Sequence, residues 1–232
     1  MEKKHNKNRA PSNKQRMNRI IIICEGQTEQ EFCRNILYPY FINKDIEIEY
    51  PTIKKSGGGI VKWTELKKQI ENHLKENAYV TTFVDFYGIT TKHAFPKWKE
   101  SEAIVDKDKK MAFIENEMRN DIDEKIRYKF IPYIQLHEFE SLLFIDYDTF
   151  VTNVPSDDFI GKTELKETLN NFKNPEMINN SKETSPSHRL ERIIRGYEKI
   201  TYGIYLADEI GLGNIRNKCP RFNSWIEKIE NI

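Results

Sequence analysis

Hydrophobic residues in this chain come in short runs that are separated by amphipathic stretches. Residues 19–24 form an unbroken run of mostly β-branched side chains, and residues 79–84 and 130–136 form two more apolar runs. Continuous runs of this length are typical of strands that are buried on both faces of a parallel sheet. Residues 46–50 instead alternate between apolar and polar side chains. This alternation predicts a strand with one solvated face, near the edge of the sheet.

Helical periodicity fills the stretches between these strands. The spacing predicts a helix over residues 28–41, beginning at Thr28, because Glu31 stands at the distance of a capping box. Residues 63–74 repeat apolar side chains at helical spacing, and a charged helix is expected over 101–127. Strands that alternate with helices predict an α/β, Rossmann-like fold with a mostly parallel sheet flanked by helices.

The pattern becomes mainly helical after about residue 146, with loops rich in Asn, Pro and Ser. Helical spacing recurs there in four stretches, 163–172, 187–199, 203–210 and 221–231. The changes in pattern predict three parts: a basic flexible arm over residues 1–18, an α/β domain over 19–146, and a helical subdomain over 147–232 that packs on the sheet.

Composition excludes several classes of protein. Of the 232 residues, 38% are hydrophobic and 31% are charged, which is sufficient for a packed core without disulfides or a structural metal. The sequence has no apolar run of the roughly 18 residues that a membrane span needs, and its polar N-terminus does not resemble a secretory signal. Three cysteines without metal-ligand spacing predict free thiols in a reducing compartment, the cytoplasm. Membrane, secreted disulfide-rich and zinc-finger proteins are therefore excluded.

The net charge of +1 hides an asymmetry between the arm and the body. Residues 1–19 carry seven Lys or Arg against one Glu, so their formal charge is +6 and the remainder carries −5. One interpretation is that the arm contacts nucleic acid or an acidic partner. The other is that the arm is a solubilising tail. The sequence leaves both open.

Acidic residues stand where the predicted buried strands end. Glu25 follows the first strand, Asp85 follows the second, and Glu138 and Glu140 follow the third. Ligands of open α/β sheets bind at the carboxyl ends of the strands, so we expect these carboxylates to converge. Because convergent carboxylates repel one another, a cation normally accompanies them, and oxygen ligands favour Mg²⁺ or Mn²⁺. A metal held in this way indicates phosphodiester or phosphoryl-transfer chemistry. The simpler alternative is a set of turn residues that face solvent.

Five further residues are candidates for the same chemistry. His137 would act as a general base or orient a carboxylate, or is a half-buried side chain with one hydrogen bond. Glu29 would reach the cation or favour the N-terminus of its helix. Arg189, Lys199 and Arg216 are candidate phosphate contacts in the C-terminal part, although solvated helix charges need no such role.

The block Glu-Gly-Gln-Thr-Glu at residues 25–29, directly after an apolar strand, resembles the first motif of Toprim domains. More closely, nearly the whole chain after the arm resembles a prokaryotic family catalogued as domain of unknown function 4276, which is grouped with Toprim-like proteins. The other matching blocks are residues 84–88, 130–144, 186–190 and 215–222. The central His-Glu-Phe-Glu sequence is the most distinctive of them.

The resemblance carries expectations about the site. In Toprim domains of topoisomerases, primases and overcoming-lysogenization-defect-type nucleases, a Glu after the first strand and an Asp-x-Asp after a later strand hold Mg²⁺. By this resemblance Glu25 matches the Glu and Asp85 matches the first Asp, but Tyr87 occupies the position of the second acid. Either Glu138 or Glu140 supplies the missing carboxylate, or the site binds metal weakly or not at all.

The sequence and the resemblance together predict a nuclease that needs Mg²⁺ (or Mn²⁺) and cleaves DNA or RNA. The expected metal ligands are Glu25, Asp85, Glu138 and Glu140. Glu29 or His137 would position or activate a water molecule. The resemblance also implies the effector of a two-gene anti-phage defence system with an ABC-type or related ATPase partner.

A different class of function is kept as an alternative because of Tyr87. In this alternative the chain is a catalytically degenerate Toprim-like module that docks on an ATPase or regulates it. A phosphatase or a phosphoacceptor built on Asp85 is disfavoured, because no lysine stands at a matching strand end. The sequence does not decide between DNA and RNA, nor whether the chain forms a homo-oligomer.

Overall fold

The computed structural model describes residues 18–54, 57, 59–179, 181 and 183–232. The predicted basic arm, residues 1–18, therefore lies almost entirely outside the described residues. Within the described part, the helices lack the length and apolar content that crossing a bilayer requires.

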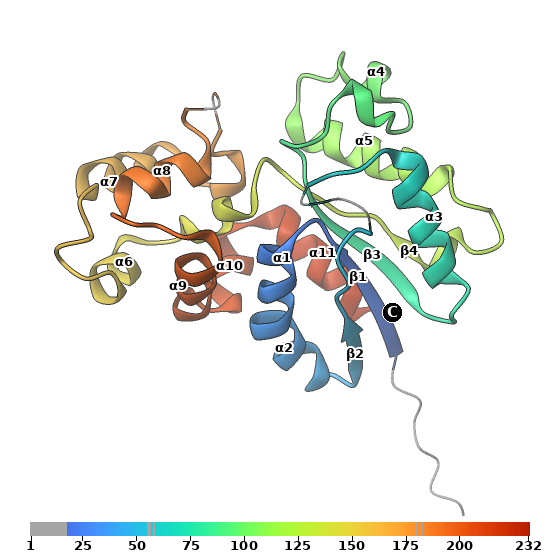
Figure 1. The fold of residues 1–232 in the computed structure, drawn as a ribbon, viewed down its shortest axis with the longest axis horizontal. Helices are drawn as coiled ribbons and strands as arrows, with labels where there is room; N and C mark the ends of the chain where they lie inside the picture. The colour runs from blue at the N-terminus through green and yellow to red at the C-terminus, as the bar shows by residue number, and fades with distance from the viewer. Residues whose placement is uncertain (1–17, 55–56, 58, 180, 182) are drawn as a thin grey trace, which may run out of the picture.

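The centre of the fold is a parallel sheet of five strands (Figure 1). The strands are β1 (Asn18–Cys24), β2 (Ile46–Glu49), β3 (Tyr79–Asp85), β4 (Phe130–Ile131) and β5 (Ile134–Gln135). Their order is β2-β1-β3-β4, with β5 also paired to β3, and all these pairings are parallel. This arrangement confirms the predicted α/β fold with a mostly parallel sheet.

The sequence pattern explains the place of each strand. The apolar runs of β1 and β3 lie in the middle of the sheet, where both faces are covered. The alternating strand β2 lies at the edge, and its side chains alternate between buried and exposed as predicted. The third apolar run is not one strand: Pro132, which has no N–H to donate, separates β4 from β5.

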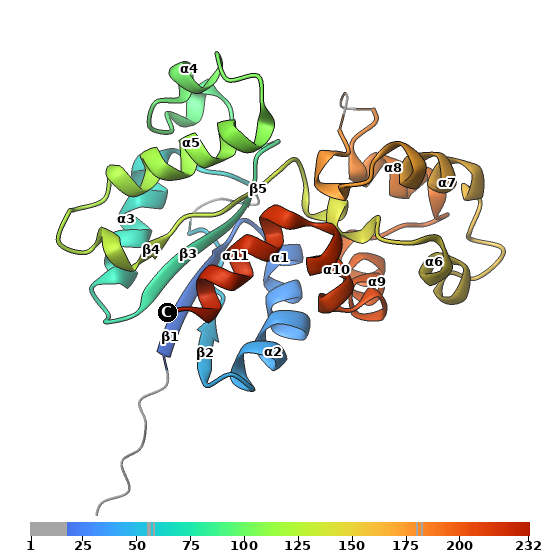
Figure 2. The same ribbon diagram turned by 180° about the vertical axis from the view of Figure 1, so that it is seen from behind.

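Helices cover both faces of the sheet (Figures 1 and 2). On one face lie α1 (Gln27–Phe32), the π-helix η1 (Cys33–Leu37), α2 (Tyr38–Ile42) and α11 (Pro220–Glu230). On the other face lie α3 (Trp63–Leu74), α4 (Trp98–Ser101) and α5 (Lys107–Asn120). The charged helix predicted over 101–127 is therefore wrong in its bounds, because α4 ends where that helix was expected to begin and α5 stops at Asn120.

The beginning of the first helix also differs from the prediction. The N-cap is Gly26 rather than Thr28, and Glu29 Oε2 accepts the Gly26 N–H at 2.9 Å. Glu31 does not complete the expected capping box: its carboxylate pairs instead with Arg34, at 2.7 Å. The capping-box pattern did not locate this N-cap because glycine has no side chain that could accept a hydrogen bond from the helix.

The remaining elements form a helical group beside the sheet (Figure 1). They are α6 (Tyr147–Asn153), α7 (Lys162–Asn171), α8 (Pro186–Ile193), the π-helix η6 (Lys199–Gly203), α9 (Ile204–Ile210) and α10 (Leu212–Lys218). The chain also forms short 3₁₀ turns: η2 (Thr91–His93) and η3 (Arg127–Lys129) lie between elements of the α/β part, and η4 (Phe139–Leu143) and η5 (Pro175–Met177) follow β5. The helix expected over 187–199 ends at Ile193, because Ile194 leaves it to form an antiparallel bridge with Phe159.

The last helix returns from this group to the sheet. The Trp225 ring on α11 stacks on Tyr133 with their centroids 4.5 Å apart, and its Nε1–H donates to Thr81 Oγ1 at 2.8 Å. A buried indole with its N–H paired is a strong anchor. Figure 2 shows α11 lying along the sheet. The C-terminal part thus shares a core with the α/β part; the predicted domain boundaries stay a prediction.

Candidate metal centre

The sheet has a topological switch point between β1 and β3. The chain passes from β1 to β2 on one side, through α1 and α2, and then crosses through α3 to β3 on the other side. In open α/β sheets, ligands bind outside the carboxyl ends of the strands at such a point. Glu25 directly follows β1, and Asp85 is the last residue of β3. The topology therefore places both predicted ligands at the expected binding crevice.

Glu25 and Asp85 are joined by a direct hydrogen bond. Glu25 Oε2 accepts the backbone N–H of Asp85 at 2.9 Å, and the Glu25 N–H donates to the Phe83 carbonyl at 3.0 Å. The loop after β3 lies against the same carboxylate, because a Cβ built on Gly88 would stand 3.4 Å from Glu25 Oε1. The side chain of Glu25 is thus held between the two strand ends and the following loop.

After β5, an unusual backbone turn at His137 brings the following residues to the same edge of the sheet. His137 has φ +70°, in the left-handed region that residues other than glycine seldom adopt. Its carbonyl accepts the Tyr87 N–H at 3.1 Å, which ties this turn to the loop after Asp85. The chain then enters η4 with Glu138 at its N-cap position, and Glu138 Oε2 accepts the Ser187 N–H at 3.0 Å.

Glu140 is the most buried of these acids, at 1% exposure. Its Oε1 forms an ion pair with the Lys199 ammonium, whose Nζ lies 2.8 Å away. Lys199 begins η6, which packs against both α1 and η4. Lys199 was predicted as a candidate phosphate contact, and no sequence pattern indicates its ion pair with Glu140.

The five carboxylates influence one another electrostatically. We call them the carboxylate cluster: Glu25, Glu29, Asp85, Glu138 and Glu140. Burial raises the pKa of Asp85 well above its usual range, and repulsion by the other four members raises it further. Burial raises the pKa of Glu25 to about 7, against the opposing effect of the Asp85 N–H. Burial also raises the pKa of Glu29 and of Glu140. The other four acids that the sequence singles out thus lie within electrostatic reach of Asp85.

The donor chemistry of the cluster fits a hard divalent cation. All its ligating atoms are carboxylate oxygens, which suit Mg²⁺ or Mn²⁺. Asp85 Oδ1 is buried and has no hydrogen-bond partner among the described residues, which is unusual for a buried polar atom of a native protein. Among the same residues, however, no three acidic, His or Cys side chains stand close enough to hold a metal ion as they are. A cation would have to draw these side chains closer together.

A lysine that sequence analysis missed holds His137. Lys107 Nζ lies 2.9 Å from His137 Nε2 and also donates to the Asn179 carbonyl at 3.3 Å. Burial, with the nearby Lys107 charge adding to its effect, lowers the pKa of His137 to about 4. The imidazole is therefore neutral and accepts at Nε2. Lys107 is the first residue of α5 and carries no sequence signal that would distinguish it from other helix lysines.

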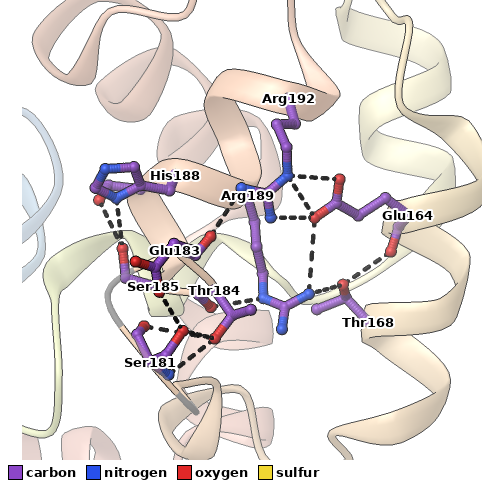
Figure 3. A network of polar contacts seen from close by, with 10 residues as sticks. Glu164, Thr168, Ser181, Glu183, Thr184, Ser185, His188, Arg189 and Arg192 are labelled. Carbon is purple, nitrogen blue, oxygen red and sulfur yellow. Dashed lines mark hydrogen bonds and ion pairs between the residues drawn. The ribbon is translucent and has the colours of Figure 1, made fainter.

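The two predicted arginine contacts are engaged by the protein itself. Arg189 donates to the Thr184 carbonyl at 2.8 Å and to Thr168 Oγ1 at 3.1 Å, within the network that joins α7 and α8 (Figure 3). Arg216 pairs with Glu230 at 3.1 Å and also contacts Tyr40. The Arg189 bonds lie within the helical group, whereas those of Arg216 connect α10 to α11 and α2 on the sheet. A role of either arginine in nucleic-acid binding stays a prediction.

Comparison with known proteins identifies a family for the chain. Residues 24–230 match the family described as Domain of unknown function (DUF4276), and the chain belongs to that family. No curated protein and no solved structure matches it. The expected relationship to Toprim domains therefore stays a prediction.

Proposed function

We propose that this DUF4276 protein is a nuclease that hydrolyses phosphodiester bonds of DNA or RNA with the help of Mg²⁺ or Mn²⁺. The observation that carries the proposal is the carboxylate cluster at the switch point, around a buried Asp85 oxygen that has no partner among the described residues. A buried group of like charges is costly unless a cation neutralises it. Its position is where open α/β sheets bind their ligands.

The residues have distinct roles in this proposal. Glu25 and Asp85 hold the cation at the two central strand ends. Glu138 and Glu140 supply the carboxylates that Tyr87 does not, and Tyr87 itself is 43% exposed. A divalent cation at this position polarises a phosphate oxygen and lowers the pKa of a bound water.

Of the two candidates for orienting that water, Glu29 is the better placed. It belongs to the carboxylate cluster, and its bond to the Gly26 N–H fixes its side chain. His137 Nε2 accepts a hydrogen bond from the Lys107 ammonium, so this nitrogen is not free to accept a proton from water. We therefore assign His137 a positioning role, in which it keeps the turn before Glu138 in place.

The test is a cleavage assay on plasmid DNA, single-stranded DNA and total tRNA, with EDTA, Mg²⁺ or Mn²⁺. The informative variant is Glu25→Gln, which removes the charge but keeps an oxygen for the Asp85 N–H. The matched control is Glu124→Gln, since the Glu124 side chain is 86% exposed. We expect metal-dependent cleavage by the wild type and the control, and at least about a hundredfold loss in Glu25→Gln, as for other groups that stabilise the transition state directly. Equal activity in all three proteins would overturn the assignment.

A second function is supported by the incomplete metal geometry and by Tyr87 in place of an acid. In this reading the chain is a non-catalytic module that docks on an ATPase, as the family resemblance suggests. Adding the product of a neighbouring ATPase gene separates the two. Cleavage that starts on addition supports a gated nuclease, whereas tight association without cleavage supports the module.

A further inference from the structure

Lys199 places a positive charge inside the carboxylate cluster. Its Nζ lies 2.8 Å from Glu140 Oε1. Its charge also acts on Glu25 and Glu29, whose pKa values it lowers against the larger effect of burial. Burial works to lower the pKa of Lys199, but the attraction of Glu140, with Glu138 and Asp85 adding, raises it overall. The ammonium is thus a counterion for the cluster as a whole.

One ammonium leaves other polar atoms of this region unsatisfied. Asp85 Oδ1 and the Tyr197 hydroxyl are both buried and have no hydrogen-bond partner within the described part of the chain. Tyr197 lies two residues before Lys199 and interacts electrostatically with Glu140 and Glu138. Buried polar atoms of native proteins are nearly always paired, so these two indicate an occupant other than the ammonium.

The Lys199 side chain is far more exposed to solvent than the carboxylate with which it pairs. Its side chain is 50% exposed, whereas that of Glu140 is 2% exposed. Lys199 therefore reaches the buried carboxylate from the surface. An ammonium on a flexible four-carbon stem is strongly hydrated in water. A movement of Nζ from Glu140 into solvent would exchange the carboxylate for water as its partner.

We propose that Lys199 is the counterion of the metal-free cluster and that a divalent cation displaces its ammonium from Glu140 on binding. This inference rests on the proposed metal centre and adds the residue that sets its affinity. A divalent cation carries twice the charge of the ammonium and takes several oxygen ligands at once. The buried carboxylates thus exchange one positive partner for another, and the metal-free chain keeps part of its negative charge neutralised.

The test measures Mn²⁺ affinity from the electron paramagnetic resonance signal of the free ion, independently of cleavage. Lys199→Met removes the charge with little change in length, and Lys199→Arg keeps it. Lys44→Met, at a lysine that pairs with Glu230, is the matched control. We expect Lys199→Met to bind Mn²⁺ about tenfold or more tightly than the wild type, which is about 1.4 kcal/mol. The other two variants should stay within about threefold.

A second readout covers the effect of the substitution on folding. In EDTA, Lys199→Met is expected to unfold at a lower temperature than the wild type, because the buried carboxylates lose their counterion, and saturating Mn²⁺ should close the gap. If Lys199→Met does not fold, Lys199→Gln removes the charge while keeping a hydrogen-bond donor for Glu140.

The outcomes separate this inference from the proposed function. Unchanged or weaker Mn²⁺ binding in the uncharged variants, with binding by the wild type intact, would overturn the counterion role and leave the nuclease proposal standing. Absence of Mn²⁺ binding in the wild type and in every variant would overturn the metal centre itself. Binding by Lys199→Met where the wild type shows none would support displacement.

Discussion

Glu25 Oε2 accepts the backbone N–H of Asp85 at 2.9 Å. A side chain that is proposed to bind metal therefore also joins the ends of the two central strands. Because the two roles use different properties of the group, substitutions can separate them. The structural role needs an oxygen acceptor, and the metal role needs a negative charge.

We predict that Glu25→Ala destabilises the fold and that Glu25→Gln does so much less. The alanine leaves the Asp85 N–H without its acceptor, which costs about 1–3 kcal/mol when the group is buried. Chemical denaturation of both variants in EDTA gives the comparison. Equal stability of the two variants would show that the hydrogen bond contributes little.

Asp85→Asn is predicted to stabilise the metal-free protein. Asp85 is buried among four other carboxylates, and its raised pKa reports that the charged form is disfavoured there. A neutral amide of the same shape removes that repulsion, so the variant is expected to be more stable than the wild type at pH 8 in EDTA. Thermal unfolding with and without Mg²⁺ tests this. A lower melting temperature of the variant in EDTA would contradict the electrostatic account.

Because His137 has left-handed backbone, we predict that a glycine variant at this position is more stable than an alanine variant, the reverse of the order in a helix. At φ +70° a Cβ is strained, so His137→Gly is expected to be about 1 kcal/mol more stable than His137→Ala. Both variants lose the contact with Lys107, so their difference isolates the backbone.

A helix position provides the control for this pair. In the last turn of α5, Glu117→Gly is expected to be less stable than Glu117→Ala by up to about 1 kcal/mol. Urea denaturation of the four variants measures both differences. The same order at the two positions would rule out strain at His137.

Glu176 predicts a pH dependence of stability outside the metal centre. Its carboxylate accepts the N–H groups of Arg221 and Phe222 at 2.9 and 3.0 Å, at the start of α11. Burial nevertheless raises its pKa to about 7. The unfolded chain has the ordinary value of about 4.3, so the folded state holds the proton more tightly. The stability contribution is full below about pH 4 and is lost as the pH rises to 7.

The comparison with Glu176→Gln isolates this group. Between pH 4.5 and pH 8 the wild type is expected to lose on the order of 3 kcal/mol relative to the glutamine variant, from a shift of this size. Denaturation at a series of pH values measures the difference. A constant difference across the range would mean that Glu176 titrates alike in both states.

The sequence was sufficient for the sheet and for most of the carboxylate cluster. Short, unbroken apolar runs rich in β-branched side chains favour buried strands, and residues that follow parallel strands gather at one edge of the sheet. The break between β4 and β5 was also readable in principle, because Pro132 cannot take part in a ladder. The alternation of apolar and polar residues over 46–50 correctly predicted an edge strand, because such a strand has one buried and one solvated face.

Contacts between distant segments were not predictable in this way. Nothing in the local sequence distinguishes Lys199 and Lys107 from other lysines of helices. Only the tertiary structure brings Lys199 to Glu140 and Lys107 to His137. The N-cap at Gly26 was missed because the rule relies on a capping side chain. Nor does the sequence indicate that the guanidinium of Arg189, a candidate phosphate contact, donates to the Thr184 carbonyl and Thr168 Oγ1.

The account depends most directly on whether the carboxylate cluster binds a divalent cation. Isothermal titration of the wild type with Mg²⁺ and with Mn²⁺, beside Asp85→Asn and the Glu124→Gln control, measures this. The account predicts saturable binding of about one ion per chain in the wild type and the control, and its loss in Asp85→Asn. Binding that is equal in all three proteins, or absent from the wild type at millimolar metal, would contradict it.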